Sequence, residues 1–119
     1  YQATGDRGRL EAASAGLRKA VALDPSNGPA HYVLGVTLYR LEDFPAAAAS
    51  LERALAVDPG IGEALYYLGL AHLRAGDPDR ACVRLKAYRG TAHFAALPAE
   101  EKEAVDGLVA RFCRGDGPP

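Results

Sequence analysis

The chain has 119 residues, of which 49% are hydrophobic and 24% are charged, and its formal net charge is -1. This is the composition of one globular domain rather than of a disordered chain. The charge provides no overall basic field, and no apolar run reaches the roughly 20 residues that a membrane span needs. We therefore expect neither nucleic-acid binding nor membrane insertion. Eleven arginines against three lysines, with abundant alanine, suggest a GC-rich bacterial genome.

The dominant feature of the sequence is a period of 34 residues. The stretch LDPSNGPAHYVLG at residues 23–35 matches VDPGIGEALYYLG at residues 57–69, with Asp-Pro, Leu-Gly and a tyrosine in the same places. Farther on, Ala47 aligns with Ala81. A fixed period of this length is typical of stacked helical hairpins.

Residues 1–27 precede the first complete unit, and we expect them to be the end of an earlier, partial repeat. Its first helix would end near Gly5-Asp6, and residues 7–9 would connect it to a second helix. That helix would stop at Asp24-Pro25, since proline lacks an N–H and disfavours helix in the residue before it. The chain opens at Tyr1 without an initiator methionine or a secretory signal, so we expect a piece of a longer protein.

Residues 28–61 and 62–89 each predict a pair of antiparallel helices. The first helix of each pair carries leucines at helical spacing. The second begins after Asp43 or Asp77, an acidic cap followed by a proline in the first turn, where its missing N–H is harmless. A glycine in the middle of each first helix costs about 1 kcal/mol relative to alanine. We therefore expect the partner helix to pass close to it, with Ala47 or Ala81 opposite.

The end of the chain does not continue the period. Residues 90–97 are expected to be a linker, and residues 98–114 a capping helix packed on the last repeat. Pro98 and the glutamates that follow it suit the start of a helix. Its apolar positions form one stripe, made of Val105, Leu108, Val109 and Phe112. Residues 115–119 are expected to be a disordered tail.

Together these features resemble the tetratricopeptide repeat (TPR) family. The resemblance is carried by the period, by Leu-Gly in each first helix, by the small residue that opens each second helix, and by the closing Asp-Pro. Residues 62–89 match until Tyr88, which stands where the family has alanine. The resemblance implies an all-α fold, a short right-handed α-solenoid of antiparallel helix pairs, with residues 98–114 as its C-terminal cap.

Two features of the sequence could be taken for a cofactor site. Gly60 and Gly62 precede a helix, as in a phosphate cradle, but a dinucleotide fingerprint needs a preceding strand and a third glycine where Leu65 stands. We therefore interpret the glycine pair as a turn. The serines lie in no nucleophile motif, and no acid pair marks a catalytic pocket. We expect no enzymatic activity and no cofactor.

The histidines and cysteines give no metal-ligand spacing. His31 and His72 fall on packing stripes, where we interpret the rings as filler, and His93 falls in the linker, where we expect it to be exposed. Cys82 and Cys113 are too few for a disulfide framework, and they favour a reducing, cytoplasmic compartment. A metal site built from these two cysteines with His72 and His93 is the disfavoured alternative.

The first helices carry a second apolar stripe besides the packing stripe. In the TPR family this face lines a concave groove that binds peptides, and Arg40 and Arg74 would lie at its rim, unless they are simply solvated. The resemblance thus predicts the following groove residues: Tyr32, Val36, Tyr39, Arg40, Tyr66, Leu70, Leu73 and Arg74. Members that clamp acidic chaperone C-termini carry lysine and asparagine on this face. Because Val36 and Leu70 stand here, that mode is disfavoured.

The predicted function is therefore a protein–protein interaction module, a scaffold or adaptor that binds an apolar peptide or helix in its concave groove. Large aromatic side chains would supply most of the binding energy. Two alternatives remain at this point. The open face of the partial first repeat could mediate a homodimer, or the domain could be a non-catalytic spacer or regulatory part of a larger enzyme.

Overall fold

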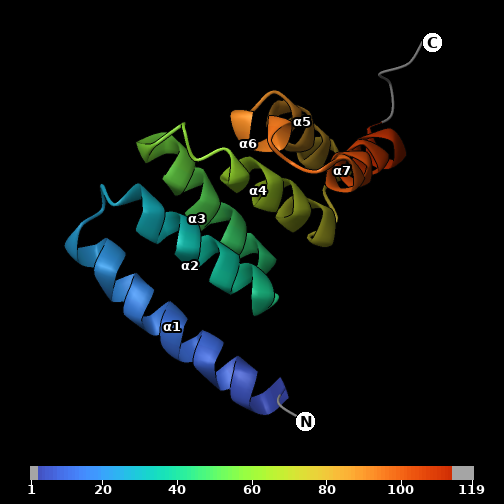
Figure 1. Ribbon diagram of the computed structural model, residues 1–119. Coiled ribbons are helices and arrows are strands. Elements are labelled where there is room, and N and C mark those ends of the chain that lie inside the picture. The colour runs from blue at the N-terminus through green and yellow to red at the C-terminus, as the bar shows by residue number, and fades with distance from the viewer. Residues whose placement is uncertain (1–2, 114–119) are drawn as a thin grey trace.

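The fold is an array of helices, and the computed structural model describes residues 3–113 of it. No strand occurs in this range, and the predicted all-α fold is confirmed (Figure 1). The predicted tail, residues 115–119, lies outside the described residues, as does Tyr1. The helices are α1 (Ala3–Leu23), α2 (Gly28–Arg40), α3 (Phe44–Val57), α4 (Glu63–Arg74), α5 (Pro78–Arg89), α6 (Ala92–Ala95) and α7 (Ala99–Phe112).

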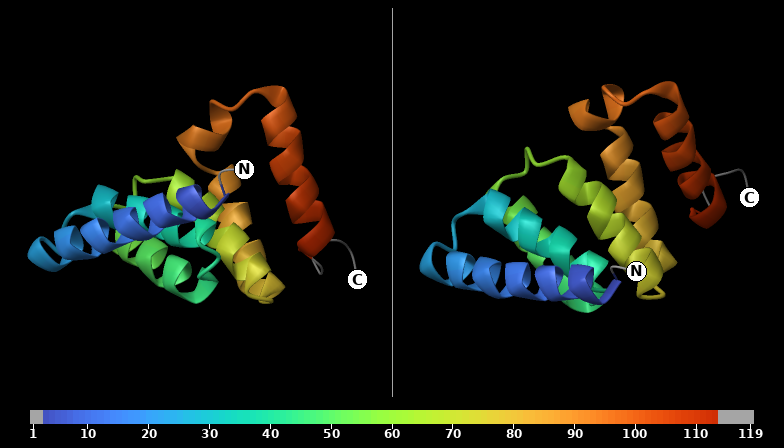
Figure 2. Two further views of the ribbon diagram at one scale, coloured as in Figure 1. Left: turned by 90° about the horizontal axis from the view of Figure 1, so that it is seen from below. Right: turned by 60° about the horizontal axis from the view of Figure 1, so that its bottom comes forward.

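The helices pack on one another in chain order. Helix α2 contacts α3, α3 contacts α4, and α4 contacts α5. Helix α1 packs on α2 at one end of the array, and α7 packs on α5 at the other end (Figures 1 and 2). Packing mainly between neighbours is the arrangement of a repeat solenoid. In the described range, no helix combines the length and apolar character needed to cross a membrane.

Side-chain caps start the helices where the sequence predicts them. The Asp43 carboxylate accepts a hydrogen bond from the Ala46 N–H (3.4 Å), and the Asp77 carboxylate accepts one from the Arg80 N–H (3.1 Å). A proline follows each cap within the first two helical positions. Each such cap stabilises its helix by about 1 kcal/mol. The start of α3 and the start of α5 are therefore determined by residues next to them in the sequence.

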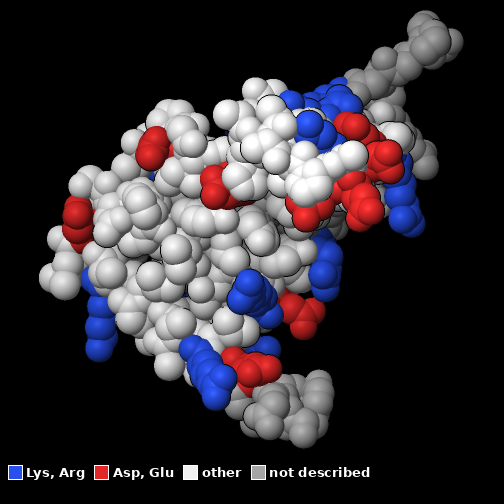
Figure 3. Space-filling model, in the orientation of Figure 1, with Lys and Arg blue, Asp and Glu red and all other residues white. Residues whose placement is uncertain are grey.

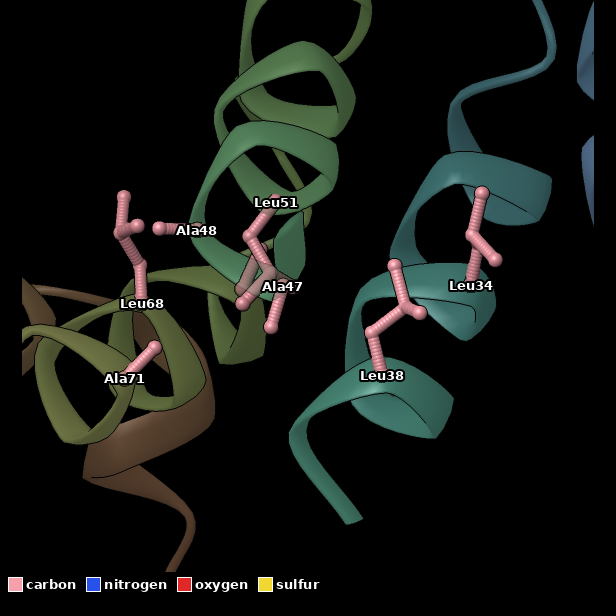
Figure 4. Packing of buried hydrophobic residues seen from close by; sticks show 8 residues of the cluster. Leu34, Leu38, Ala47, Ala48, Leu51, Leu68 and Ala71 are labelled. Carbon is pink, nitrogen blue, oxygen red and sulfur yellow. The ribbon is translucent and has the colours of Figure 1, made fainter. Parts of the chain in front are cut away.

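The mid-helix glycines lie where two helices meet closely, as predicted. A Cβ added to Gly35 would lie 2.6 Å from Leu51 Cγ and 3.3 Å from the Ala47 carbonyl oxygen. Gly69 has the same relation to Leu85, at 2.7 Å. The main core cluster continues from this contact across α2, α3 and α4 (Figure 4). Its buried members are Leu34, Leu38, Ala47, Ala48, Leu51, Ala64, Leu68 and Ala71.

This packing predicts the effect of enlarging Ala47, which has no exposed surface. Ala47→Leu is expected to lower the free energy of unfolding by about 1–3 kcal/mol, because the added carbons overpack the contact with Gly35. Thermal denaturation followed by circular dichroism measures the change. Ala49→Leu is the matched control, since Ala49 is exposed on the same helix. Equal melting temperatures for the two variants would contradict the packing described here.

The expected break near residues 7–9 is wrong, because α1 runs without interruption from Ala3 to Leu23. Gly8 stands alone there, and a single glycine costs a helix about 1 kcal/mol without ending it. No proline follows to remove a backbone N–H. The inner side of α1 is fixed instead by Leu17 and Val21, which pack against the main core cluster.

The C-terminal region departs from the predictions in two details. The linker at residues 90–97 contains the short helix α6, which is capped by the Thr91 hydroxyl accepting from the Phe94 N–H. Cys82 on α5 and Cys113 after α7 form a disulfide, with 5.1 Å between their Cα atoms. The cysteine count favoured a reducing compartment, and this pairing removes the basis for that inference. The capping helix itself is present as predicted, as α7.

Candidate functional site

The predicted groove residues all lie on α2 and α4, and their tyrosines form one connected aromatic row. Tyr67 is at its centre: its ring centroid lies 6.2 Å from that of Tyr32, 5.9 Å from that of Tyr39 and 5.5 Å from that of Tyr66. All four of these side chains are partly exposed. Tyr67 was not among the predicted groove residues, because it falls beside the stripe that selects Tyr66. Because Tyr67 directly follows Tyr66, it does not share the helical spacing of Tyr66, Leu70 and Leu73 that predicted the groove.

An open cavity of about 450 Å³ lies at one end of this row, between α4 and α7. Of the predicted residues, only Tyr32 and Tyr66 line it. The full lining is Tyr32, Glu63, Tyr66, Tyr67, Tyr88, His93, Leu97, Glu101, Ala104 and Val105. Half of this lining comes from residues after the second complete repeat. The cavity therefore depends on how α6 and α7 fold back onto α4 and α5.

The remaining apolar residues of the predicted groove differ in whether their side chains pack against other parts of the fold. Val36 and Leu70 are partly exposed and belong to neither core cluster. Tyr39 packs edge-on against Phe44, with 5.4 Å between the ring centroids. Leu73 packs against the second core cluster, formed by Leu85, Val109 and Cys113, so its side chain also holds α7 in place.

The two arginines of the predicted rim lie away from the tyrosine cavity. Arg74 Nη2 is 3.3 Å from Glu42 Oε1, and its guanidinium lies 4.8 Å from the centre of the Phe44 ring. Arg40 is exposed and lines a shallow hollow together with Asp6 and Leu10 of α1. Arg74 thus already has a partner, and Arg40 faces the N-terminal end of the array.

Tyr88 joins the cavity to the interior. It is only 2% exposed, and its ring centroid lies 5.3 Å from that of Tyr66 and 5.7 Å from that of Phe94. Its hydroxyl shares a hydrogen bond of 2.7 Å with His93 Nδ1. His93 is exposed as predicted, but it also links Tyr88 to Glu63, whose Oε2 lies 3.9 Å from His93 Nε2. The sequence signal for these contacts was Tyr88 itself, a bulky residue that stands where the family has alanine.

The hydroxyls of Tyr32, Tyr66 and Tyr88 remain protonated at neutral pH. Burial, and next the Glu63 carboxylate, raise the pKa of Tyr32 to about 12. Burial also raises the pKa of Tyr66 and of Tyr88, and Glu101 adds to both effects. Neutral hydroxyls can donate and accept hydrogen bonds, so the negative charge at the cavity comes from the two glutamates.

The other two histidines are packing residues, as predicted. His31 is buried, and its Nε2 lies 3.0 Å from the Pro25 carbonyl oxygen. His72 is buried on α4, and burial lowers its pKa, so the ring is neutral at pH 7. Within residues 3–113, no group of three or more His, Cys, Asp or Glu side chains is arranged to hold a metal ion.

The chain resembles several solved structures across nearly all of its length. It superimposes on the TPR2B domain of yeast Sti1, solved as a pHsp70 complex, with a TM-score of 0.76, 18% identity, and coverage of 92% of this chain and 86% of that one. For the Yersinia enterocolitica type III secretion chaperone SycD, solved with a peptide of the translocator YopD, the TM-score is 0.77 at 16% identity, with 94% and 84% covered. For the first TPR of Spaghetti (RPAP3), bound to the HSP90 peptide SRMEEVD, it is 0.74 at 16% identity, with 91% and 85% covered.

Family-level similarity extends from α1 into α5. No curated protein matches the sequence. A profile described as tetratricopeptide repeat matches residues 32–84, and one described as TPR repeat matches residues 5–42. The 34-residue period, the close Gly35 and Gly69 contacts and these matches agree with one another. The chain belongs to the tetratricopeptide repeat family.

Proposed function

We propose that this protein is a non-catalytic interaction module that binds a segment of another protein in the groove along α2, α4 and α7. The observation that carries the proposal is the open tyrosine cavity, which continues into the aromatic row of α2 and α4. Val36 and Leu70 add partly exposed apolar surface that the core does not use. Apolar pockets with aromatic anchors supply most of the energy in such interfaces.

The similar structures support this kind of function. SycD and Spaghetti were each solved with a bound peptide. The Spaghetti peptide, SRMEEVD, carries three acidic residues. In this protein the cavity of the groove is lined by Glu63 and Glu101, and its lining includes no lysine or arginine. The proposed occupant is therefore an apolar segment rather than an acidic chain terminus.

Self-association through the N-terminal end is the weaker candidate. The exposed side chains of α1 include charged residues along its length, namely Arg7, Glu11, Arg18 and Lys19. Burying such a face against a second copy would require desolvating these charges. The face along α2 and α4, in contrast, includes aromatic and aliphatic side chains, and Figure 3 shows few charged side chains over these helices. This difference favours binding of a different protein in the groove.

The test is a pull-down from a lysate of the native organism with wild-type protein and with Leu70→Glu. A charge at position 70 would be buried by a ligand in the groove, so we expect proteins captured by the wild type to be lost. Val83→Glu is the matched control, because Val83 is 63% exposed on α5 outside the groove. Circular dichroism confirms that both variants are folded. Equal capture by wild type and Leu70→Glu would contradict the proposal.

A further inference from the structure

The tyrosine cavity combines aromatic faces with carboxylates from separate helices. Tyr32 comes from α2, Glu63, Tyr66 and Tyr67 come from α4, and Glu101 comes from α7. A volume of about 450 Å³ is large enough for an extended side chain. Tyrosine rings attract cations through their electron-rich faces, and carboxylates supply a counter-charge. This pairing of groups is suited to a cationic ligand.

Neither cavity carboxylate forms an ion pair with a lysine or an arginine within residues 3–113. Elsewhere, Glu42, Glu52 and Asp106 each pair with an arginine. Glu63, by contrast, has only the imidazole of His93 nearby, at 3.9 Å, and Glu101 forms no ion pair within residues 3–113. Acidic side chains also gather over α7 beside the cavity (Figure 3). The carboxylates of the cavity lining are therefore not balanced by a lysine or an arginine of that lining.

We propose that this cavity receives a lysine or arginine side chain of the bound partner segment, with the tyrosine rings against its alkyl chain and Glu63 and Glu101 as counter-ions. This inference rests on the proposed function, since it specifies what the groove ligand carries. The partner is thus an apolar segment with a basic side chain at the position that reaches α7. Arginine fits particularly well, because its planar guanidinium stacks on aromatic rings and binds carboxylates through two N–H groups.

The remaining features of the cavity support a cation rather than an anion. The hydroxyls of Tyr32 and Tyr66, whose pKa values burial raises, are neutral at pH 7 and supply no positive charge to an anion. An incoming carboxylate would face two glutamates without a neighbouring lysine or arginine in the lining. Like charges at such a site disfavour the wrong ligand and so contribute to specificity.

The probe for this proposal is N-acetyl-arginine amide, with N-acetyl-citrulline amide as its neutral analogue. Both are titrated into the ¹⁵N-labelled protein and followed by NMR. We expect the arginine amide to shift the signals of Glu63, Tyr66 and Glu101, and to bind about fivefold or more tightly than the citrulline amide. The double variant E63Q/E101Q is expected to abolish this preference.

The matched control is E52Q/E103Q, which removes the same charge from exposed positions outside the cavity lining. It is expected to keep the preference for arginine. Equal binding of the two amides, shifts away from the cavity, or the same loss in both double variants would overturn the proposal. If the arginine amide does not bind while capture still depends on Leu70, the cation site falls and the groove stands. If arginine binds at the cavity but capture is independent of Leu70, the groove proposal falls instead.

Discussion

Replacing Tyr88 with alanine is expected to lower the free energy of unfolding by about 3–5 kcal/mol, the usual range for removing a buried aromatic side chain. Tyr88 is 2% exposed, and its ring contacts Tyr66 on α4 together with His93 and Phe94 on α6. Its removal leaves a void under the cavity floor that α6 cannot fill without moving. Urea denaturation followed by circular dichroism measures the change, since the midpoint shifts with stability when the slope is constant.

Tyr88→Phe distinguishes the contribution of the ring to stability from that of the hydroxyl. This variant keeps the packing and loses only the hydrogen bond with His93, so it is expected to cost about 0.5–1.5 kcal/mol. Binding to the groove should follow the same order, with Tyr88→Ala weakened more than Tyr88→Phe, because the ring supports Tyr66. If the two variants are equally stable, the aromatic contacts do not hold this end of the fold together.

The repeat units could be predicted from the sequence because their determinants are local or periodic. The caps at Asp43 and Asp77 act within three residues. The glycine in the middle of each first helix indicates that the partner helix passes close by, and the 34-residue period repeats this signal at Gly69. The long α1 shows the limit of this reasoning. Its expected break followed from matching Gly5-Asp6 to the end of the first helix of a repeat, with residues 7–9 as extra connecting residues, whereas α1 continues through them.

The cavity could not be predicted in the same way, because its walls come from segments far apart in the sequence. Tyr32 and Tyr66 follow the helical period and were found, but Glu101 and Leu97 belong to the region beyond the repeats. Their place beside α4 depends on how α7 docks on α5, which buries Val105 and Val109. The pairing of the two cysteines depends on the same docking, and their spacing in the sequence carries no sign of it.

Removing the disulfide is the second change with a large expected effect. Cys82 and Cys113 close a loop with a sequence separation of 31 residues, and the loss of such a cross-link is expected to destabilise the fold by about 3–4 kcal/mol through the entropy of the unfolded chain. Helix α7 contacts the array mainly through α5, so it should be the first element to open. Cys82→Ser/Cys113→Ser, or reduction of the wild type, tests this.

Hydrogen exchange shows where the loss of stability falls. The amides of α7 are expected to lose protection in the double variant, while those of α3 in the main core cluster keep most of theirs, because α3 is held between α2 and α4. Adding reductant to the double variant is the control and should change nothing. Since α7 supplies Glu101 and Val105 to the cavity, arginine-amide binding should weaken together with the protection of α7. Unchanged exchange in α7 on reduction would instead mean that Val105 and Val109 alone are enough to hold this wall of the groove.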